Sequence, residues 1–247
     1  MRYLILSDIH SNFTALEAGL AAAEGRWDKV VCLGDLVGYG PDPNEVVDRI
    51  RALDATTIRG NHDRVCCGLT EAEDFNPVAR GAVNWTRQQL RPENQQYLES
   101  LPSGPLVVNG MVLIHGAVRD EDEYVIAPGQ ALASLLEASS DLSFFGHTHL
   151  QGGFSFHENQ LAVIHPKYGA QAGFWPLHVE PATRYLLNPG SIGQPRDGDS
   201  RAAFIIADID HQVIEYWRVP YEIRAVQQRM FRAGLHESLI LRLALGR

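Results

Sequence analysis

Metal-binding side chains follow five short apolar runs of the chain. The runs are LILSDIH, VVCLGD, TTIRGNHD, MVLIHG and LSFFGHTH, and each places polar groups directly after strand-type residues. The polar residues at these run ends are Asp8, His10, Asp35, Asn61, His62, His115, His147 and His149. In a sheet of roughly parallel strands the carboxyl ends open on one edge, so ligands that are distant in sequence can meet in one cleft. The pattern therefore predicts a metal-binding cleft.

The ligand types in this set narrow the choice of metal. Carboxylates and imidazoles without cysteine suit Mn²⁺, Fe, Co²⁺, Ni²⁺ or Zn²⁺, and one carboxylate can bridge two such ions. Asp35 is our candidate for the bridge. The neutral amide of Asn61 makes sense as a ligand beside a strongly charged centre that other residues already serve. We therefore expect two divalent ions, and we favour Mn²⁺.

Two of the ligand pairs are separated by a single residue. Asp8 and His10 form one pair, and His147 and His149 form the other. Side chains two positions apart on a strand point to the same face. If strand geometry continued through these motifs, each pair would bind one metal ion or straddle two.

A hydrolytic centre of this kind also needs a proton donor. Two cations about 3.5–4 Å apart would lower the pKa of a shared water and hold the phosphate oxygens during in-line attack. The departing oxygen then needs a proton. We expect His62 to act as the general acid, because Asn61 is committed to metal and Asp63 is close enough in sequence to orient and charge the imidazole.

The order of these motifs matches a known family. D-x-H, G-D, G-N-H-D, an isolated H-G and G-H-T-H, over residues 8–149, resemble the motifs of the calcineurin-like metallophosphoesterases. The sequence is similar to the compact bacterial and archaeal phosphodiesterase branch, and LNPGSIGQPRDG at 187–198 also looks like that branch. The resemblance implies a four-layer αββα sandwich.

The resemblance also implies a role for each motif residue. It places Asp8, His10, Asp35 and His149 on the first metal ion. It places Asp35, Asn61, His115 and His147 on the second ion. It makes His62 the catalytic histidine and Asp63 its partner.

The motifs and the resemblance together predict an enzyme. We expect a dinuclear metal-dependent phosphoesterase, a phosphodiesterase that hydrolyses small phosphate esters by direct attack of a metal-bridging hydroxide. Two alternatives stay open: a phosphoprotein (Ser/Thr) phosphatase, and a non-catalytic metal-binding scaffold for protein interactions. The presence of His62 and of all seven ligand residues argues against the scaffold. The small size and the lack of large insertions between motifs favour a small-molecule substrate over a protein.

Three further residues are candidates for substrate binding. Arg196 could hold two phosphate oxygens through its guanidinium, or it could be solvated after the Gln-Pro turn. Asn12 could contact the substrate, although it is also well placed to cap the first helix. Tyr39, in the GYGPDP loop, could stack on a base or aryl group, or pack the loop.

The elements that must position these residues form an α/β (α+β) pattern. Strands are expected at 2–7, 30–34, 56–60, 106–115, 142–146, 154–165, 184–193 and 202–219, with turns at Asn109-Gly110, Glu158-Asn159 and Asp210-His211. Helices are expected at 14–25, 44–53 and 129–140. This order indicates two mixed β-sheets packed as a sandwich and flanked by helices, in a single domain over 1–247. A helical flank at about 76–101 would cover one side of the cleft, and a helix at about 221–245 would serve packing or a homo-oligomer.

Composition limits the partners of the chain. Hydrophobic residues at 45% and charged residues at 21% are ordinary for a globular protein. A net charge of −9 and a pI near 5.5 argue against binding of long nucleic acid or of an anionic membrane. A small phosphate ester, such as a nucleotide derivative, is still compatible because bound dications reverse the local charge.

The N-terminal segment and the cysteines together predict a cytoplasmic protein. The first aliphatic run, residues 4–6, is too short for a signal peptide or a membrane span. Cys32, Cys66 and Cys67 are odd in number and have no zinc-type spacing, which fits a reducing compartment.

Overall fold

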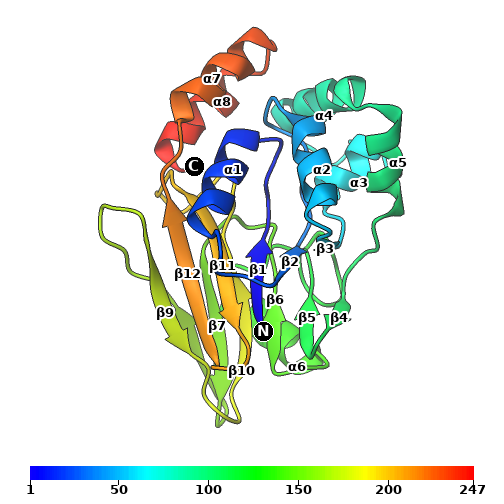
Figure 1. Ribbon diagram of the computed structural model, residues 1–247. Coiled ribbons are helices and arrows are strands. Elements are labelled where there is room, and N and C mark those ends of the chain that lie inside the picture. The colour runs from blue at the N-terminus through cyan, green and yellow to red at the C-terminus, as the bar shows by residue number, and fades with distance from the viewer.

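The computed structural model describes residues 1–247 and contains two six-stranded mixed sheets. The first sheet consists, in spatial order, of β3 (Thr56–Thr57), β2 (Lys29–Cys32), β1 (Arg2–Leu6), β11 (Ala202–Asp208), β12 (Val213–Val219) and β9 (Gly173–His178). The second consists of β4 (Leu106–Val108), β5 (Met111–Leu113), β6 (Leu142–Phe144), β10 (Arg184–Asn188), β7 (Gly152–His157) and β8 (Gln160–Ile164). The motif-bearing strands are parallel within each sheet: β1 with β2 and β3, and β5 with β6. β1 runs upward from the N-terminus in Figure 1, toward the end of the molecule where most helices gather.

Alternating residues of the strands build two separate cores. In β1, Tyr3 and Ile5 belong to the cluster between the sheets, which also contains Phe144 of β6. Leu4 and Leu6 belong to the cluster on the opposite, helix-covered face. Every second side chain of a strand points to the same face, so one short apolar run stabilises both layers.

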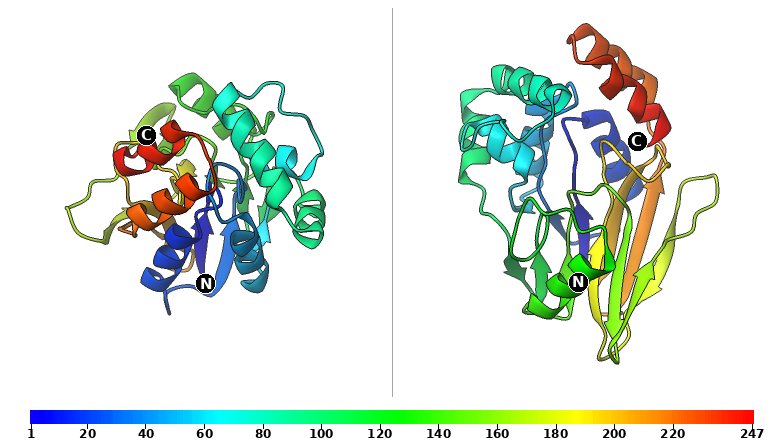
Figure 2. Two further views of the ribbon diagram at one scale, coloured as in Figure 1. Left: turned by 90° about the horizontal axis from the view of Figure 1, so that it is seen from above. Right: turned by 180° about the vertical axis from the view of Figure 1, so that it is seen from behind.

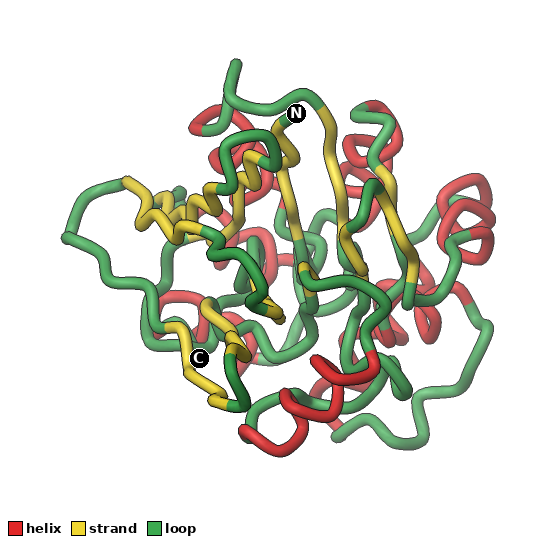
Figure 3. Tube along the Cα trace, turned by 90° about the horizontal axis from the view of Figure 1, so that it is seen from below, coloured by secondary structure: helices red, strands yellow, loops and turns green.

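Eight helices surround the two sheets (Figure 1). They are α1 (Phe13–Ala22), α2 (Pro43–Ala52), α3 (Asn61–Cys67), α4 (Pro77–Gln89), α5 (Pro92–Ser100), α6 (Pro128–Glu137), α7 (Ile223–Arg232) and α8 (Glu237–Leu245). Leu16 of α1 and Ile50 of α2 pack on the first sheet, whereas Leu135 of α6 packs against Phe145 and Leu186 of the second sheet. Seen from below, the strands lie between helices on opposite sides (Figure 3). The expected αββα sandwich is confirmed.

The C-terminal segment differs from the single helix that its sequence pattern predicted. It forms a hairpin of α7 and α8, which break at Gly234, whose φ of +72° an L side chain rarely adopts. Val226, Met230 and Leu243 of this hairpin pack in one cluster with Tyr39. The hairpin forms one end of the molecule (Figure 2). Its apolar face is therefore covered by the chain's own residues.

The turns predicted at Asn109-Gly110 and Glu158-Asn159 are present, and the structure contains one strand that the sequence pattern did not predict. Asn109 and Gly110 both have positive φ and join β4 to β5, and Glu158 and Asn159 do the same between β7 and β8. β9 lies in a segment that the sequence pattern did not mark as a strand, because Pro176 interrupts it, and it forms an edge of its sheet. No helix combines the length and the apolar character needed to cross a membrane.

Candidate metal centre

The polar residues that follow the strands meet at one place, where the backbone no longer has strand geometry. Asp8, His10, Asp35, His147 and His149 all have positive φ, from 48° at His10 to 65° at His147. Such values are uncommon for residues other than glycine and cluster at functional sites. The expectation that strand alternation would align these side chains is wrong, because the strands end at residues 6 and 144, before the motifs. Left-handed turns align them instead.

The ligand residues form two groups that share one carboxylate. The first group is Asp8, His10, Asp35 and His149, and the second is Asp35, His115 and His147. Within each group one candidate ligand atom per residue lies within 4.8 Å of the others. Asp35 Oδ2 is 3.5 Å from Nε2 of His10 and 3.5 Å from Nε2 of His115. This one oxygen is therefore equally placed toward both groups.

Asn61 joins the second group. Its Oδ1 lies 3.2 Å from Nε2 of His115, and it is the first residue of α3. In the first group, Asp8 Oδ1 lies 3.3 Å from Nε2 of His149. The donors are thus two carboxylates, four imidazoles and one amide oxygen, which suits two divalent transition ions.

Each of the four imidazoles in these groups is fixed by a backbone carbonyl. The acceptors are Val37 O for His10 Nδ1 (3.1 Å), Leu33 O for His115 Nδ1 (2.8 Å), Gln194 O for His149 Nδ1 (2.6 Å) and Asp122 O for His147 Nε2 (3.0 Å). A carbonyl oxygen only accepts, so the bonded ring nitrogen donates and, in the neutral imidazole, the other nitrogen keeps its lone pair. This is the arrangement that orients metal-ligating histidines in proteins.

The carboxylates are held by donors from the neighbouring turns. Asp35 Oδ1 accepts from the backbone N–H of His62 (2.9 Å), and Asp8 Oδ2 accepts from the hydroxyl of Ser7 (2.6 Å). Gly60 lies so close to Asp35 Oδ1 and to the ring of His115 that a Cβ there would overlap both. Only glycine fits between these two ligands.

The charges of the buried ligands suit a cation. Burial raises the pKa of the Asp35 carboxyl, but His115 and His62 outweigh burial and hold this pKa well below its usual value. Burial lowers the pKa of His10 and that of His149. Burial alone would also lower the pKa of His115, but the negative charge of Asp35 outweighs burial and raises this pKa to about 10. An ionised carboxylate beside neutral imidazoles is the state that binds a metal, and a bound cation would replace the proton of His115.

His62 differs from the four other site histidines. No hydrogen bond engages either of its ring nitrogens, and its Nδ1 is buried against Gly38. Its ring centroid lies 4.4 Å from that of Tyr39 and 4.8 Å from that of Phe75. Burial lowers the pKa of this imidazole to about 4. The ring is therefore free to bond to a ligand.

The expected pairing of Asp63 with His62 is wrong. Asp63 accepts instead from the backbone N–H groups of Gly60 (3.0 Å) and Val37 (3.2 Å). Adjacent residues on a helix do not face each other, and α3 begins at Asn61, so the two side chains diverge. Asp63 therefore holds the motif loops together.

A cavity of about 500 Å³ opens from the second ligand group. Its lining includes Asn61, His62 and His147 of the site together with Phe75 and Tyr124. The ring of Tyr124 stacks on His147 at 3.9 Å between centroids, and its side chain is 44% exposed. The cavity therefore has one aromatic ring beside His62, that of Phe75, and another beside His147, that of Tyr124.

Sequence reasoning missed the loop that carries Tyr124. Arg64 of α3 pairs with Glu121 and with Asp122 (2.6 Å), which ties this loop to the site. The signal was present in the acidic and aromatic segment at 119–124, which follows His115 at a strand end.

The three candidate substrate residues have different surroundings. Asn12 caps α1 by accepting from Ala15 N (3.1 Å) and donates to Gly193 O (2.9 Å), so both of its polar atoms are used. Tyr39 lies in the site, with its ring 4.6 Å from that of His10. Arg196 is half-buried near Tyr39, and its guanidinium makes no hydrogen bond.

Comparison with known proteins decides the family. Residues 1–212 match the model of the calcineurin-like phosphoesterase superfamily domain. The chain belongs to this superfamily. It is accordingly a metal-dependent phosphoric ester hydrolase, and the motif order that suggested the family is confirmed.

Relatives extend the match over the whole chain. The crystal structure of a metallophosphoesterase from Sphaerobacter thermophilus is 42% identical, with a TM-score of 0.87 and coverage of 100% of this chain and 99% of the other. An uncharacterized protein of Methanocaldococcus jannaschii is 33% identical over 98% of this chain and 97% of its own length. A hypothetical protein from Pyrococcus horikoshii shares the fold, with 20% identity, a TM-score of 0.79 and coverage of 100% and 98%.

Proposed function

We propose that this phosphoesterase is a dinuclear phosphodiesterase that hydrolyses small phosphate esters. The observation that supports it best is the position of Asp35, whose Oδ2 lies 3.5 Å from an imidazole of each ligand group. A carboxylate shared in this way suits two adjacent cations. Asp8, His10 and His149 would complete the first site, and Asn61, His115 and His147 the second.

The bound cations and His62 would have different roles in the reaction. When bound, two divalent cations, for which we favour Mn²⁺, would polarise the phosphate and lower the pKa of a water molecule. His62 would donate a proton to the departing ester oxygen, since its ring nitrogens are unbonded and its side chain lines the cavity. The negative charge of a bound phosphate would raise the pKa of His62 from its low value in the free protein.

The cavity supports a small substrate. A volume of about 500 Å³ is in the usual range for small-molecule sites, and its aromatic side chains offer flat apolar surfaces. Tyr124 keeps one face for stacking, because its other face contacts His147. We propose that one ester substituent, such as a nucleoside, occupies this cavity. A phosphoprotein substrate would need an extended binding surface instead of this cavity.

The cytoplasmic location of the protein stays a prediction.

The test is reconstitution of the metal-free protein. We would add Mn²⁺, Ni²⁺ or Zn²⁺ separately and follow hydrolysis of an aryl phosphodiester and an aryl phosphomonoester. The proposal expects metal-dependent turnover with the diester preferred. His62→Ala should keep its metal and lose turnover by about 10²–10⁴-fold. His165→Ala, which changes an exposed histidine outside the site, is the matched control.

The outcomes separate the alternatives. Preference for the monoester would contradict the diesterase assignment and favour a phosphatase. Metal binding without turnover of either ester would favour the scaffold.

A further inference from the structure

Two arginines from distant parts of the chain lie against the ring of Tyr39. The Cζ atoms of Arg196 and Arg242 are each 5.9 Å from the centroid of this ring. The same ring lies 4.4 Å from the ring of His62 and 4.6 Å from that of His10. One aromatic ring therefore lies next to both guanidinium groups and to two histidines of the candidate site.

Neither guanidinium group has an acidic partner. Arg196 forms no ion pair and no side-chain hydrogen bond, and Arg242 donates only to Gln194 Oε1 (3.1 Å). By contrast Arg229, on the same C-terminal hairpin, pairs with Asp42 (2.8 Å). Burial and the nearby charge of Arg196 both lower the pKa of Arg242. Two like charges are thus held close together, partly buried, without a counter-charge.

An anion between these groups would remove the repulsion. A guanidinium can bind two phosphate oxygens at once, and charged hydrogen bonds of this kind are among the stronger ones in proteins. Partly buried charges without partners are costly, so the arrangement favours an anionic ligand. Arg196 is also next to the first ligand group, because its backbone N–H donates to the carbonyl oxygen of His149 (3.2 Å).

The opposite side of the site disfavours a second phosphate. The wall of the 500 Å³ cavity carries Glu71, Asp74 and Asp122. Arg64 pairs with Asp122 (2.6 Å) and Arg87 pairs with Glu71 (3.7 Å), but Asp74 has no ion pair. The unpaired carboxylate of Asp74 disfavours a second anionic group in the cavity, whereas the two arginines favour one.

We propose that Arg196 and Arg242 bind a second phosphate group of the substrate, next to the phosphate that is hydrolysed. This proposal rests on the proposed function and narrows it to compounds with at least two linked phosphates, such as nucleoside diphosphates and their esters. The metal centre holds one phosphate, the arginines hold the next, and the organic group lies in the aromatic cavity.

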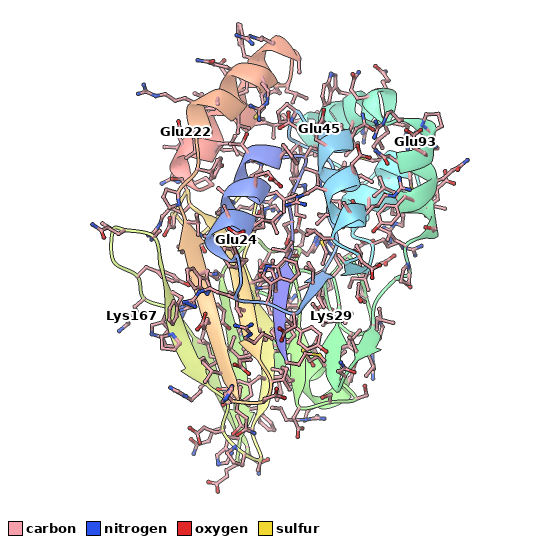
Figure 4. All side chains as sticks on the ribbon, in the orientation of Figure 1. Glu24, Lys29, Glu45, Glu93, Lys167 and Glu222 are labelled. Atoms are coloured by element: carbon pink, nitrogen blue, oxygen red, sulfur yellow. The ribbon has the colours of Figure 1, made fainter.

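One of the two arginines comes from outside the family domain. The family match ends at residue 212, whereas Arg242 is on α8 of the C-terminal hairpin, which begins after Glu222 (Figure 4). The chain's two lysines cannot take this role: Lys29 begins β2, at the end away from Asp35, and Lys167 lies in the loop before β9. Because Arg242 follows the end of the family match, the C-terminal hairpin would add a specificity residue to the family domain.

The test compares two non-hydrolysable ligands by isothermal titration calorimetry with the Mn²⁺-loaded full chain. Methylenediphosphonate has two linked phosphonates, and methylphosphonate has one. Wild type should bind the first at least about tenfold more tightly. Arg242→Gln should weaken binding of methylenediphosphonate by about tenfold and of methylphosphonate by less than about threefold, the loss expected for one charged hydrogen bond.

The controls address chelation and folding. Arg232→Gln removes the same charge from an exposed position of the same hairpin and should leave both affinities unchanged. Metal chelation by the diphosphonate would be identical in all variants. If Arg242→Gln proves unstable, Arg196→Gln replaces it, because the side chain of Arg196 makes no hydrogen bond that folding needs.

Equal losses for both ligands, or no loss for either, would overturn the proposal. These outcomes are read from binding, so they are independent of turnover. Failure of the aryl diester assay would instead contradict the proposed function.

Discussion

The Nε2 atoms of His10 and His149 lie 3.0 Å apart, although 139 residues separate the two in the sequence. Both rings donate through Nδ1 to backbone carbonyls, so in the neutral rings both Nε2 atoms present lone pairs. Two lone pairs at this separation repel each other unless they share a cation or a proton. Asp35 and Asp8, both beside this pair, make a cation the natural partner.

Removal of the shared carboxylate should abolish metal binding at both sites. In Asp35→Ala we expect the metal content to fall together with the activity, because both ligand groups lose a donor. Wild type should be stabilised by about 3 kcal/mol when free Mn²⁺ is 100-fold above its dissociation constant, and the variant should not. Elemental analysis and thermal unfolding with and without Mn²⁺ measure this. Glu24→Ala, an exposed carboxylate without an ion pair, should behave as wild type.

A methyl group at Gly60 should disturb the centre directly. The added Cβ would overlap Asp35 Oδ1 and the ring of His115, so Gly60→Ala should lose about 1–3 kcal/mol of stability and bind metal poorly. Gly81→Ala is the matched control, since Gly81 lies in α4 with open space around its Cβ position. That change should stabilise the protein by about 0.4–1 kcal/mol. Equal effects of the two substitutions in urea unfolding would contradict this account of the site.

Asp63 should matter for stability rather than for proton transfer. Asp63→Asn loses one of the two acceptors that bind Gly60 N and Val37 N, which should cost about 1–3 kcal/mol. The folded variant should keep the wild-type pH profile of turnover, because Asp63 makes no hydrogen bond to His62. A shifted profile with unchanged stability would restore the catalytic role first expected for Asp63. Denaturant unfolding and pH-dependent kinetics distinguish the two.

Tyr124 should contribute to substrate affinity. Its exposed ring face offers a stacking surface, and loss of one aromatic contact is worth about 0.5–1.5 kcal/mol. For Tyr124→Ala we expect KM for an aryl diester to rise by about two- to tenfold at unchanged metal content. Phe231→Ala, at a residue that is 77% exposed on α7, should leave KM unchanged. An unaltered KM in Tyr124→Ala would remove this ring from the substrate site.

The sequence was sufficient to predict which residues meet, but not how they meet. Asp8 and His10 follow an apolar run that can only be a strand, and parallel strands bring their ends together, so the convergence was predictable. The positive φ at both residues was not predictable, because D-x-H directly after an apolar run looks like a continuation of the strand, which in fact ends at Leu6.

Contacts that depend on tertiary packing were the least predictable. Asp63 is next to His62 in sequence, yet its carboxylate turns to backbone N–H groups of two loops. Arg242 reaches the site only because Gly234 folds the C-terminal segment back, and nothing near Arg242 resembles a motif. Tyr124 stands in a loop whose position depends on the ion pairs of Arg64.

The most direct test of the central claim is a titration of the metal-free protein with Mn²⁺ while hydrolysis of an aryl phosphodiester is followed. If Asp35 bridges two ions, the rate should rise to a plateau at two ions per chain. A plateau at one ion per chain, or a rate that does not depend on added metal, would contradict a dinuclear centre.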